Sequence, residues 1–296
     1  MRKIISKAQV KKLYIELKNY SLRLLKRIDK RVFLPTIVFQ PGKVGSSSVH
    51  ASLLKMQNEL GISAPIYHAH VLEHIDERID YVTKNRKAPK KTLNKLAESK
   101  TLREKIKNHP KQTWNVINLV REPVAMKISA FFQVLHEYIP DWESRLENGN
   151  LPMEELDDIL FHKQELGITG LDWWYDNQIK PLWGLDIFEQ PFSKEKGYQI
   201  YHHENMNLII FRLEDLNRVA EQAFAEFLGI KGFKIVNENM GEEKPYAALY
   251  KQFKQRALPT EYVDAIYKTR FARHFYADTE IEQFRQKWTN SVGKEK

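Results

Sequence analysis

The chain has 296 residues, and its 47 Lys and Arg against 38 Asp and Glu give a formal net charge of +9. This charge favours polyanionic partners such as nucleotides and acidic glycans, but it does not choose among them. Cysteine is absent, which excludes disulfide bonds, a thiolate nucleophile and cysteine-based zinc sites. A hydrophobic fraction of 42% is typical of a globular protein.

Residues 1–34 predict a basic amphipathic helix, because apolar residues recur there at helical intervals among many Lys and Arg. Such a helix can make peripheral contact with a membrane through residues 1–31, or it can pack on the rest of the protein, which we favour. The chain has no run of about eighteen apolar residues that would span a bilayer. Its N-terminus also lacks the apolar core of a secretory signal. We therefore expect a cytoplasmic protein.

From residue 35 onward, short apolar strands alternate with helical segments. Strands are predicted at 36–39, 65–72, 114–120, 198–201 and 207–211, with a hairpin joining the last two. Helices are predicted at 49–60, within 73–111, at 124–138, around 156–161, at 214–228 and in much of the chain after 246. This alternation predicts an α/β fold, with a P-loop-like parallel sheet flanked by helices. We expect residues 35–296 to form a single domain with helical N- and C-terminal extensions, and ligands to bind beyond the carboxyl ends of the strands.

A loop rich in Gly and Ser joins the first predicted strand to the first helix. Its Lys43 supplies a positive charge, Gly45 permits close approach of the backbone, and the serines add hydroxyl donors at a helix N-terminus. The serines are Ser46, Ser47 and Ser48. The pattern is typical of a phosphate cradle, although Lys43 precedes Gly45 and the loop is therefore not a Walker A motif. The alternative is an ordinary turn that caps a helix.

A second candidate phosphate contact follows the third predicted strand. Arg121 ends that strand, and Ser129 lies eight residues later, about two turns along the next helix. A guanidinium and a hydroxyl so placed can grip one phosphate together. The alternative for Arg121 is a surface ion pair with Glu122.

These two pieces, in this order, resemble the signature of sulfotransferases that use 3′-phosphoadenosine 5′-phosphosulfate (PAPS). In that family a strand–loop–helix with Lys, Gly and Ser/Thr holds the 5′-phosphosulfate, and a later Arg and Ser hold the 3′-phosphate. Residues 211–216 and 239–244 are similar to two further segments of the family, the second of which implies a nucleotide contact for Lys244. The resemblance thus implies donor-binding roles for Lys43, Gly45, Ser46, Ser47, Ser48, Arg121, Ser129 and Lys244.

His68 and His70 alternate along the second predicted strand, so their side chains should share one face. Residues 67–71 resemble the Tyr-His-x-His segment of uronosyl 2-O-sulfotransferases, and the whole chain resembles bacterial carbohydrate sulfotransferases of capsular polysaccharide synthesis. The resemblance implies that His70 is the general base and that His68 assists it. A metal site is an alternative, but a third ligand of obvious spacing is missing, and a structural role is the strongest competitor.

The resemblance implies transfer of a sulfonate group from PAPS to a hydroxyl of a carbohydrate acceptor, such as a capsular or surface polysaccharide. Lys43 would stabilise the leaving group, and neither a metal nor a nucleic acid is expected. A nucleotide-dependent kinase of related fold and a non-catalytic nucleotide- or polyanion-binding protein are the alternatives. A group of aromatic residues predicts either a sugar-stacking platform or core packing, which we favour. They are Trp173, Trp174, Tyr175 and Trp183.

Overall fold

The computed structural model describes residues 30–85, 89–162, 170–236 and 244–290. The helix predicted for residues 1–34 therefore lies almost wholly outside the described residues. The strands are β1 (Thr36–Phe39), β2 (Ile66–Ala69), β3 (Trp114–Val120), β4 (Tyr198–His203) and β5 (Met206–Arg212). They form a five-stranded sheet in the order β2-β1-β3-β5-β4.

The sheet is mostly parallel. β1 pairs in parallel with β2 and β3, and β3 pairs in parallel with β5. β4 is the exception, since it runs antiparallel to β5. The predicted hairpin is therefore confirmed, and the prediction of a parallel sheet is correct for four strands only. Only residues 204–205 separate β4 from β5, which is too short for the crossover that a parallel pair needs.

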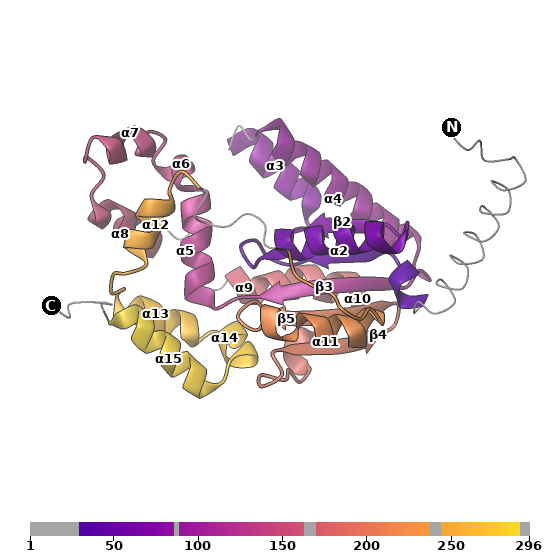
Figure 1. Ribbon diagram of the computed structural model, residues 1–296. Coiled ribbons are helices and arrows are strands. Elements are labelled where there is room, and N and C mark those ends of the chain that lie inside the picture. Colours follow the sequence, from indigo (N-terminus) through magenta and orange to yellow (C-terminus); the bar gives the residue numbers. More distant parts are fainter. Residues whose placement is uncertain (1–29, 86–88, 163–169, 237–243, 291–296) are drawn as a thin grey trace, which may run out of the picture.

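Helices cover both sides of the sheet (Figure 1). The principal ones before β4 are α2 (Ser46–Leu60), α3 (Ile75–Asn85), α4 (Lys90–Asn108), α5 (Pro123–Gln133), α6 (Leu135–Tyr138), α7 (Trp142–Glu147), α8 (Met153–His162), α9 (Gly170–Trp174) and α10 (Lys180–Trp183). After β5 come α11 (Leu216–Leu228), α12 (Ala247–Phe253), α13 (Thr260–Tyr267), α14 (Arg270–Phe275) and α15 (Asp278–Thr289). The prediction of a helical C-terminal part is confirmed.

The sheet forms the first of two hydrophobic cores. All seven residues of β3 are buried, as expected for a central strand with helices on both faces. Two of them are polar, and their amides have partners: Asn115 donates to the carbonyl of Arg31, and Asn118 donates to the carbonyl of Phe39. The hydroxyl of Tyr175 donates to Asn118 in turn, at 2.7 Å. Satisfied in this way, the two amides cost little to bury.

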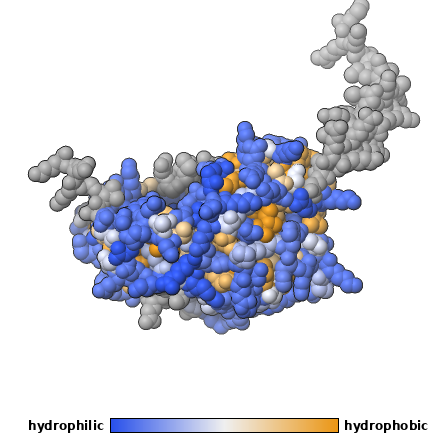
Figure 2. All heavy atoms as spheres, turned by 90° about the horizontal axis from the view of Figure 1, so that it is seen from below, coloured by the Kyte–Doolittle hydropathy of each residue, from blue (hydrophilic) through white to orange (hydrophobic). Residues whose placement is uncertain are grey.

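The second core lies among helices beyond the carboxyl edge of the sheet. It draws buried residues from α5, α8, α12, α13 and α15, and the half-buried Ile281 and Phe284 pack against both cores. Figure 2 shows a largely hydrophilic surface, with a smaller group of hydrophobic residues exposed between the hydrophilic ones. Within the described residues, no helix is long and apolar enough to cross a membrane.

Glu122 joins the two cores at the point where β3 ends. Its buried carboxylate caps α5 by accepting from the backbone N–H groups of Val124 and Ala125. It also accepts from the hydroxyl of Tyr267 at 2.7 Å and from Nε1 of Trp288 at 3.0 Å. The alternative of a surface ion pair between Arg121 and Glu122 is therefore wrong, because the carboxylate turns inward to satisfy helix-end and ring N–H donors.

We expect Glu122→Ala to lower the free energy of unfolding by about 2–4 kcal/mol, since four donors would lose their acceptor in a buried place. Chemical denaturation measures this change. The matched control is Glu261→Ala, because Glu261 is an exposed acidic residue in the first turn of α13. It should change the free energy by about 0.5 kcal/mol or less. Equal, small effects of the two substitutions would contradict the role given to Glu122.

Candidate functional site

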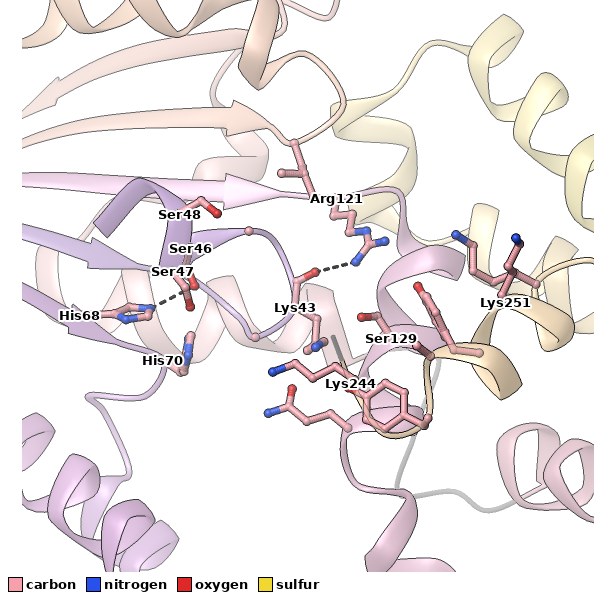
Figure 3. A pocket seen from close by; sticks show the side chains of 18 of the residues that line it. Lys43, Ser46, Ser47, Ser48, His68, His70, Arg121, Ser129, Lys244 and Lys251 are labelled. Atoms are coloured by element: carbon pink, nitrogen blue, oxygen red, sulfur yellow. Dashed lines mark hydrogen bonds between the residues drawn. The ribbon is translucent and has the colours of Figure 1, made fainter. Parts of the chain in front are cut away.

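A cavity of about 1380 Å³ opens at the carboxyl ends of the parallel strands. The ten residues nominated from the sequence all line it: Lys43, Gly45, Ser46, Ser47, Ser48, His68, His70, Arg121, Ser129 and Lys244 (Figure 3). They come from the loops after β1 and β3, from β2 and its end, from α2 and α5, and from the segment before α12. Residues far apart in the sequence thus meet in one place, as the parallel order of the strands requires.

The loop between β1 and α2 has a demanding backbone. Lys43 and Gly45 both have positive φ angles, of 70° and 82°. The φ angle of Gly45 favours glycine there, and a Cβ atom added to it would lie 2.6 Å from Cδ1 of Leu213, whose side chain would have to shift. Arg121 supports the loop, since its Nη1 donates to the carbonyl of Lys43 at 3.0 Å. The two candidate phosphate contacts are therefore parts of one structure.

Positive charge dominates the cavity. Burial lowers the pKa of Lys43, and the nearby charges of Arg121 and Lys244 lower it further. Among the described residues that line the cavity, no Asp or Glu offsets these charges. The basic lining residues are Lys43, Lys91, Lys95, Arg121, Lys244, Lys251 and Lys254. So many cations around a desolvated lysine favour a bound polyanion.

Two histidines stand together on one side of the cavity. His68 lies in β2 and His70 follows its end, and their ring centroids are 4.9 Å apart. Nε2 of His68 lies 3.0 Å from Oγ of Ser46, so this ring contacts the first turn of α2. Nδ1 of His70 lies 2.9 Å from the carbonyl oxygen of Gln40. Sequence alternation thus placed both rings on one face, although the strand itself ends at Ala69.

His70 has the hydrogen bonding of a general base. A carbonyl oxygen can only accept, so Nδ1 of His70 carries the proton, and Nε2 of the neutral ring keeps a free lone pair. Burial lowers the pKa of His70, although its side chain keeps exposed surface in the cavity. Burial, with the charges of His70, His50 and Lys95, lowers the pKa of His68 to about 3. Both rings are therefore neutral at physiological pH.

Several residues in and around the cavity were not expected from the sequence. His50 of α2 lies behind the lining and stacks on His68 with ring centroids 5.2 Å apart. Leu213 lines the cavity and lies against Gly45. Lys91 and Lys95 come from α4, and a further group comes from α12 and the residues beside it: Tyr246, Tyr250, Lys251, Lys254 and Gln255. In the sequence Lys91 and Lys95 lie within the Lys-rich residues 84–111, a pattern that does not show which lysines face a cavity.

The aromatic group pointed out in the sequence does not form a sugar platform. Trp174, Tyr175 and Trp183 are buried in the first core, and Nε1 of Trp174 donates to the carbonyl of His70 at 2.8 Å. Trp173 is exposed, but it does not line the cavity. The preference for core packing is confirmed for the three buried rings. No group of three His, Cys, Asp or Glu with a geometry suited to a metal occurs in the described parts of the chain.

The fold and the cavity define an α/β protein with a mostly parallel sheet and a cationic cavity at its carboxyl edge. Residues 150–277 match the model of the family NKWYS, described as "Putative capsular polysaccharide synthesis protein". This stretch is fewer than half of the 296 residues, and it includes Lys244 and α12 but not the β1–α2 loop or Arg121. It relates the C-terminal part of the chain to capsular polysaccharide synthesis. Neither the curated proteins nor the solved structures give a match.

The two glycines of the loop offer a matched test of its geometry. We expect Gly45→Ala to lower the free energy of unfolding by about 1–2 kcal/mol, because an L-residue is strained at its φ of 82°. Gly42→Ala should leave stability unchanged or slightly higher, since nothing lies within 4 Å of its added Cβ atom. Denaturant titration of both variants measures the difference. Equal stabilities would mean that the backbone at Gly45 is not as described.

Proposed function

We propose that the protein is a carbohydrate sulfotransferase that uses PAPS as its donor and acts in capsular or surface polysaccharide synthesis. The observation that carries this proposal is the hydrogen bond from Arg121 to the carbonyl of Lys43 within a cationic cavity whose described lining residues include no Asp or Glu. It joins two separate anion contacts, and PAPS carries an anionic group at each end of its ribose. The match of residues 150–277 supports the polysaccharide part of the proposal.

The donor would use both halves of the site. The N-terminus of α2 and the hydroxyls of Ser46, Ser47 and Ser48 would hold the 5′-phosphate, where backbone N–H groups and the helix dipole favour an anion. Arg121 and Ser129 would hold the 3′-phosphate, which PAPS has and ATP lacks. Lys244 lies close enough to Lys43 to influence its pKa and would contact the same nucleotide.

The transfer itself would be an in-line displacement at sulfur. The acceptor hydroxyl oxygen attacks the sulfur while its proton moves to Nε2 of His70. The bond between the sulfur and the bridging phosphate oxygen breaks, and 3′-phosphoadenosine 5′-phosphate leaves with the electron pair. Lys43 would stabilise the charge that builds on the bridging oxygen. Positioning and charge stabilisation carry most of the catalysis in related phosphoryl transfers, and a rigid cationic loop suits both.

A kinase of related fold is less well supported. Phosphoryl-transfer enzymes commonly hold Mg²⁺ through a carboxylate near the phosphates, whereas the described lining residues include none. The loop also lacks the Walker A order, because Lys43 precedes Gly45. A non-catalytic binding protein would need no base, yet His70 lines the cavity and its bond to Gln40 through Nδ1 leaves Nε2 as the acceptor atom of the ring.

The donor site can be tested by calorimetric titration with 3′-phosphoadenosine 5′-phosphate and with AMP, which lacks the 3′-phosphate. The wild-type protein should prefer the bisphosphate. Arg121→Ala and, separately, Ser129→Ala should reduce this preference, by about tenfold or more for the arginine because a charge-assisted contact is lost. Ser129→Ala leaves the bond between Arg121 and Lys43 in place, and it therefore separates recognition of the 3′-phosphate from support of the loop. Equal binding of the two nucleotides by the wild-type protein would contradict the proposal.

The pH dependence of turnover tests the base. His70 must be neutral to accept a proton, and burial and the charge of Lys95 lower its pKa from 6.5, against the opposing effect of its bond to Gln40. The acid limb of kcat/KM should therefore lie below pH 6.5, with activity lost as pH falls through the lowered pKa. Lys43 must stay charged, so the alkaline limb should lie below its ordinary 10.5.

Substitution of His70 gives the complementary result. His70→Ala should lower kcat by about a hundredfold or more, and the affinity for 3′-phosphoadenosine 5′-phosphate should remain within about twofold. His68→Ala is the control on the same face and should have the smaller effect on kcat. An acid limb above pH 6.5, or a larger loss in His68→Ala than in His70→Ala, would refute the assignment of the base.

A further inference from the structure

Two lysines of α4 line the cavity on the side of the histidine pair. Lys91 and Lys95 are four residues apart, so they project from the same face of the helix. Lys95 lies close enough to His68 and His70 for its charge to lower the pKa of both rings. The charges that act on Lys43 instead belong to Arg121 and Lys244. The cavity therefore has one group of cations around the loop and another beside the histidines, in addition to Lys251 and Lys254 at α12.

Three lysines of α3 and α4 outside the cavity form ion pairs: Lys84 with Asp80, Lys100 with Asp76, and Lys107 with Glu73. Lys91 and Lys95 have no acidic partner among the described residues. The same is true of Lys90, but Lys90 does not line the cavity. Like charges at this spacing destabilise a helix slightly, and a lysine in the first turn also opposes the helix dipole. The first turn of α4 contains no acidic residue that would compensate.

We propose that Lys91 and Lys95 bind an acidic group of the acceptor, and that the acceptor is therefore an acidic glycan. This inference rests on the proposed function and names its substrate class. A carboxylate or other anionic group on or next to the accepting sugar would contact the two ammonium groups. The accepting hydroxyl would then lie at Nε2 of His70, on the same side of the cavity.

The donor does not account for these two charges. Its phosphates have other partners in the proposed mode, namely the serines of α2 for the 5′-phosphate and Arg121 with Ser129 for the 3′-phosphate. Lys254, at the end of α12, already lies over the ring of Tyr250, at 5.1 Å from the ring centroid. A neutral sugar would leave Lys91 and Lys95 without an anion in the complex, whereas an acidic sugar places one beside them. Recognition of this kind would also weaken with added salt.

The test compares Lys91→Gln/Lys95→Gln with Lys90→Gln/Lys111→Gln, in which two exposed lysines outside the cavity lining lose the same charge. The probes are two uronate oligosaccharides of different linkage, unsulfated chondroitin and polymannuronate, and their carboxyl-reduced forms. Binding is measured by calorimetry in low salt, with and without 3′-phosphoadenosine 5′-phosphate. Anionic vesicles of phosphatidylglycerol and phosphatidylcholine form a separate arm.

We expect the wild-type protein and the control variant to bind at least one uronate chain and to bind its carboxyl-reduced form weakly. The cavity variant should bind the acidic chain about tenfold more weakly. Its affinity for 3′-phosphoadenosine 5′-phosphate should stay within about twofold of the wild-type value, which separates acceptor from donor effects.

Three results would overturn the inference: no binding of either uronate chain, equal binding of the carboxyl-reduced form, or equal losses in the two double variants. Binding of the vesicles alone, lost in the cavity variant, would assign the lysines to a membrane surface and would also overturn it. Failure of the nucleotide to bind would instead refute the proposed function. Because the acidic chains are also titrated without nucleotide, the two failures can be told apart.

Discussion

The buried carboxylate of Glu122 is the interaction on which the arrangement of the cavity depends. It lies just after β3, caps α5 and accepts from Tyr267 and Trp288 of the second core. Its own backbone N–H donates to Glu214, which follows β5 and also accepts from the hydroxyl of Tyr276. The ends of two neighbouring strands and the C-terminal helices are thus fixed at one point. Arg121 directly precedes this point, and Ser129 lies on the helix that it caps.

A second set of contacts fixes the loop between β1 and α2. The positive φ angles of Lys43 and Gly45 turn the chain sharply before α2, and Arg121 reaches across to the carbonyl of Lys43. The positively charged Arg121, which follows β3, therefore supports a loop that carries the positive charge of Lys43. Concentrating cations in one cavity costs stability in the unliganded protein, and binding an anion would recover that cost. The histidine pair lies on the neighbouring strand, where Gln40 and Ser46 orient the rings.

The sequence predicted the parts of the structure that depend on local pattern. β3 begins and ends where its apolar run does, because a central strand is buried along its whole length. Lys43, Arg121 and His70 could be expected to meet, since each follows a strand that pairs in parallel with its neighbour. The role of Glu122 could not be predicted, because its partners Tyr267 and Trp288 lie about 150 residues away along the chain. The positions of Lys91 and Lys95 at the cavity could not be predicted either, because neighbouring lysines have the same local pattern and only the packing of α4 decides which of them face the cavity.

The most direct test of the central claim is a crystal structure of the protein with 3′-phosphoadenosine 5′-phosphate, grown without divalent metal. We expect the 5′-phosphate at the N-terminus of α2, against Ser46, Ser47 and Ser48, and the 3′-phosphate at Arg121 and Ser129. The open end of the 5′-phosphate should then face Lys43 and Nε2 of His70, where the sulfonate group would be transferred. A nucleotide bound elsewhere, or with its 3′-phosphate away from Arg121, would contradict a PAPS-dependent function.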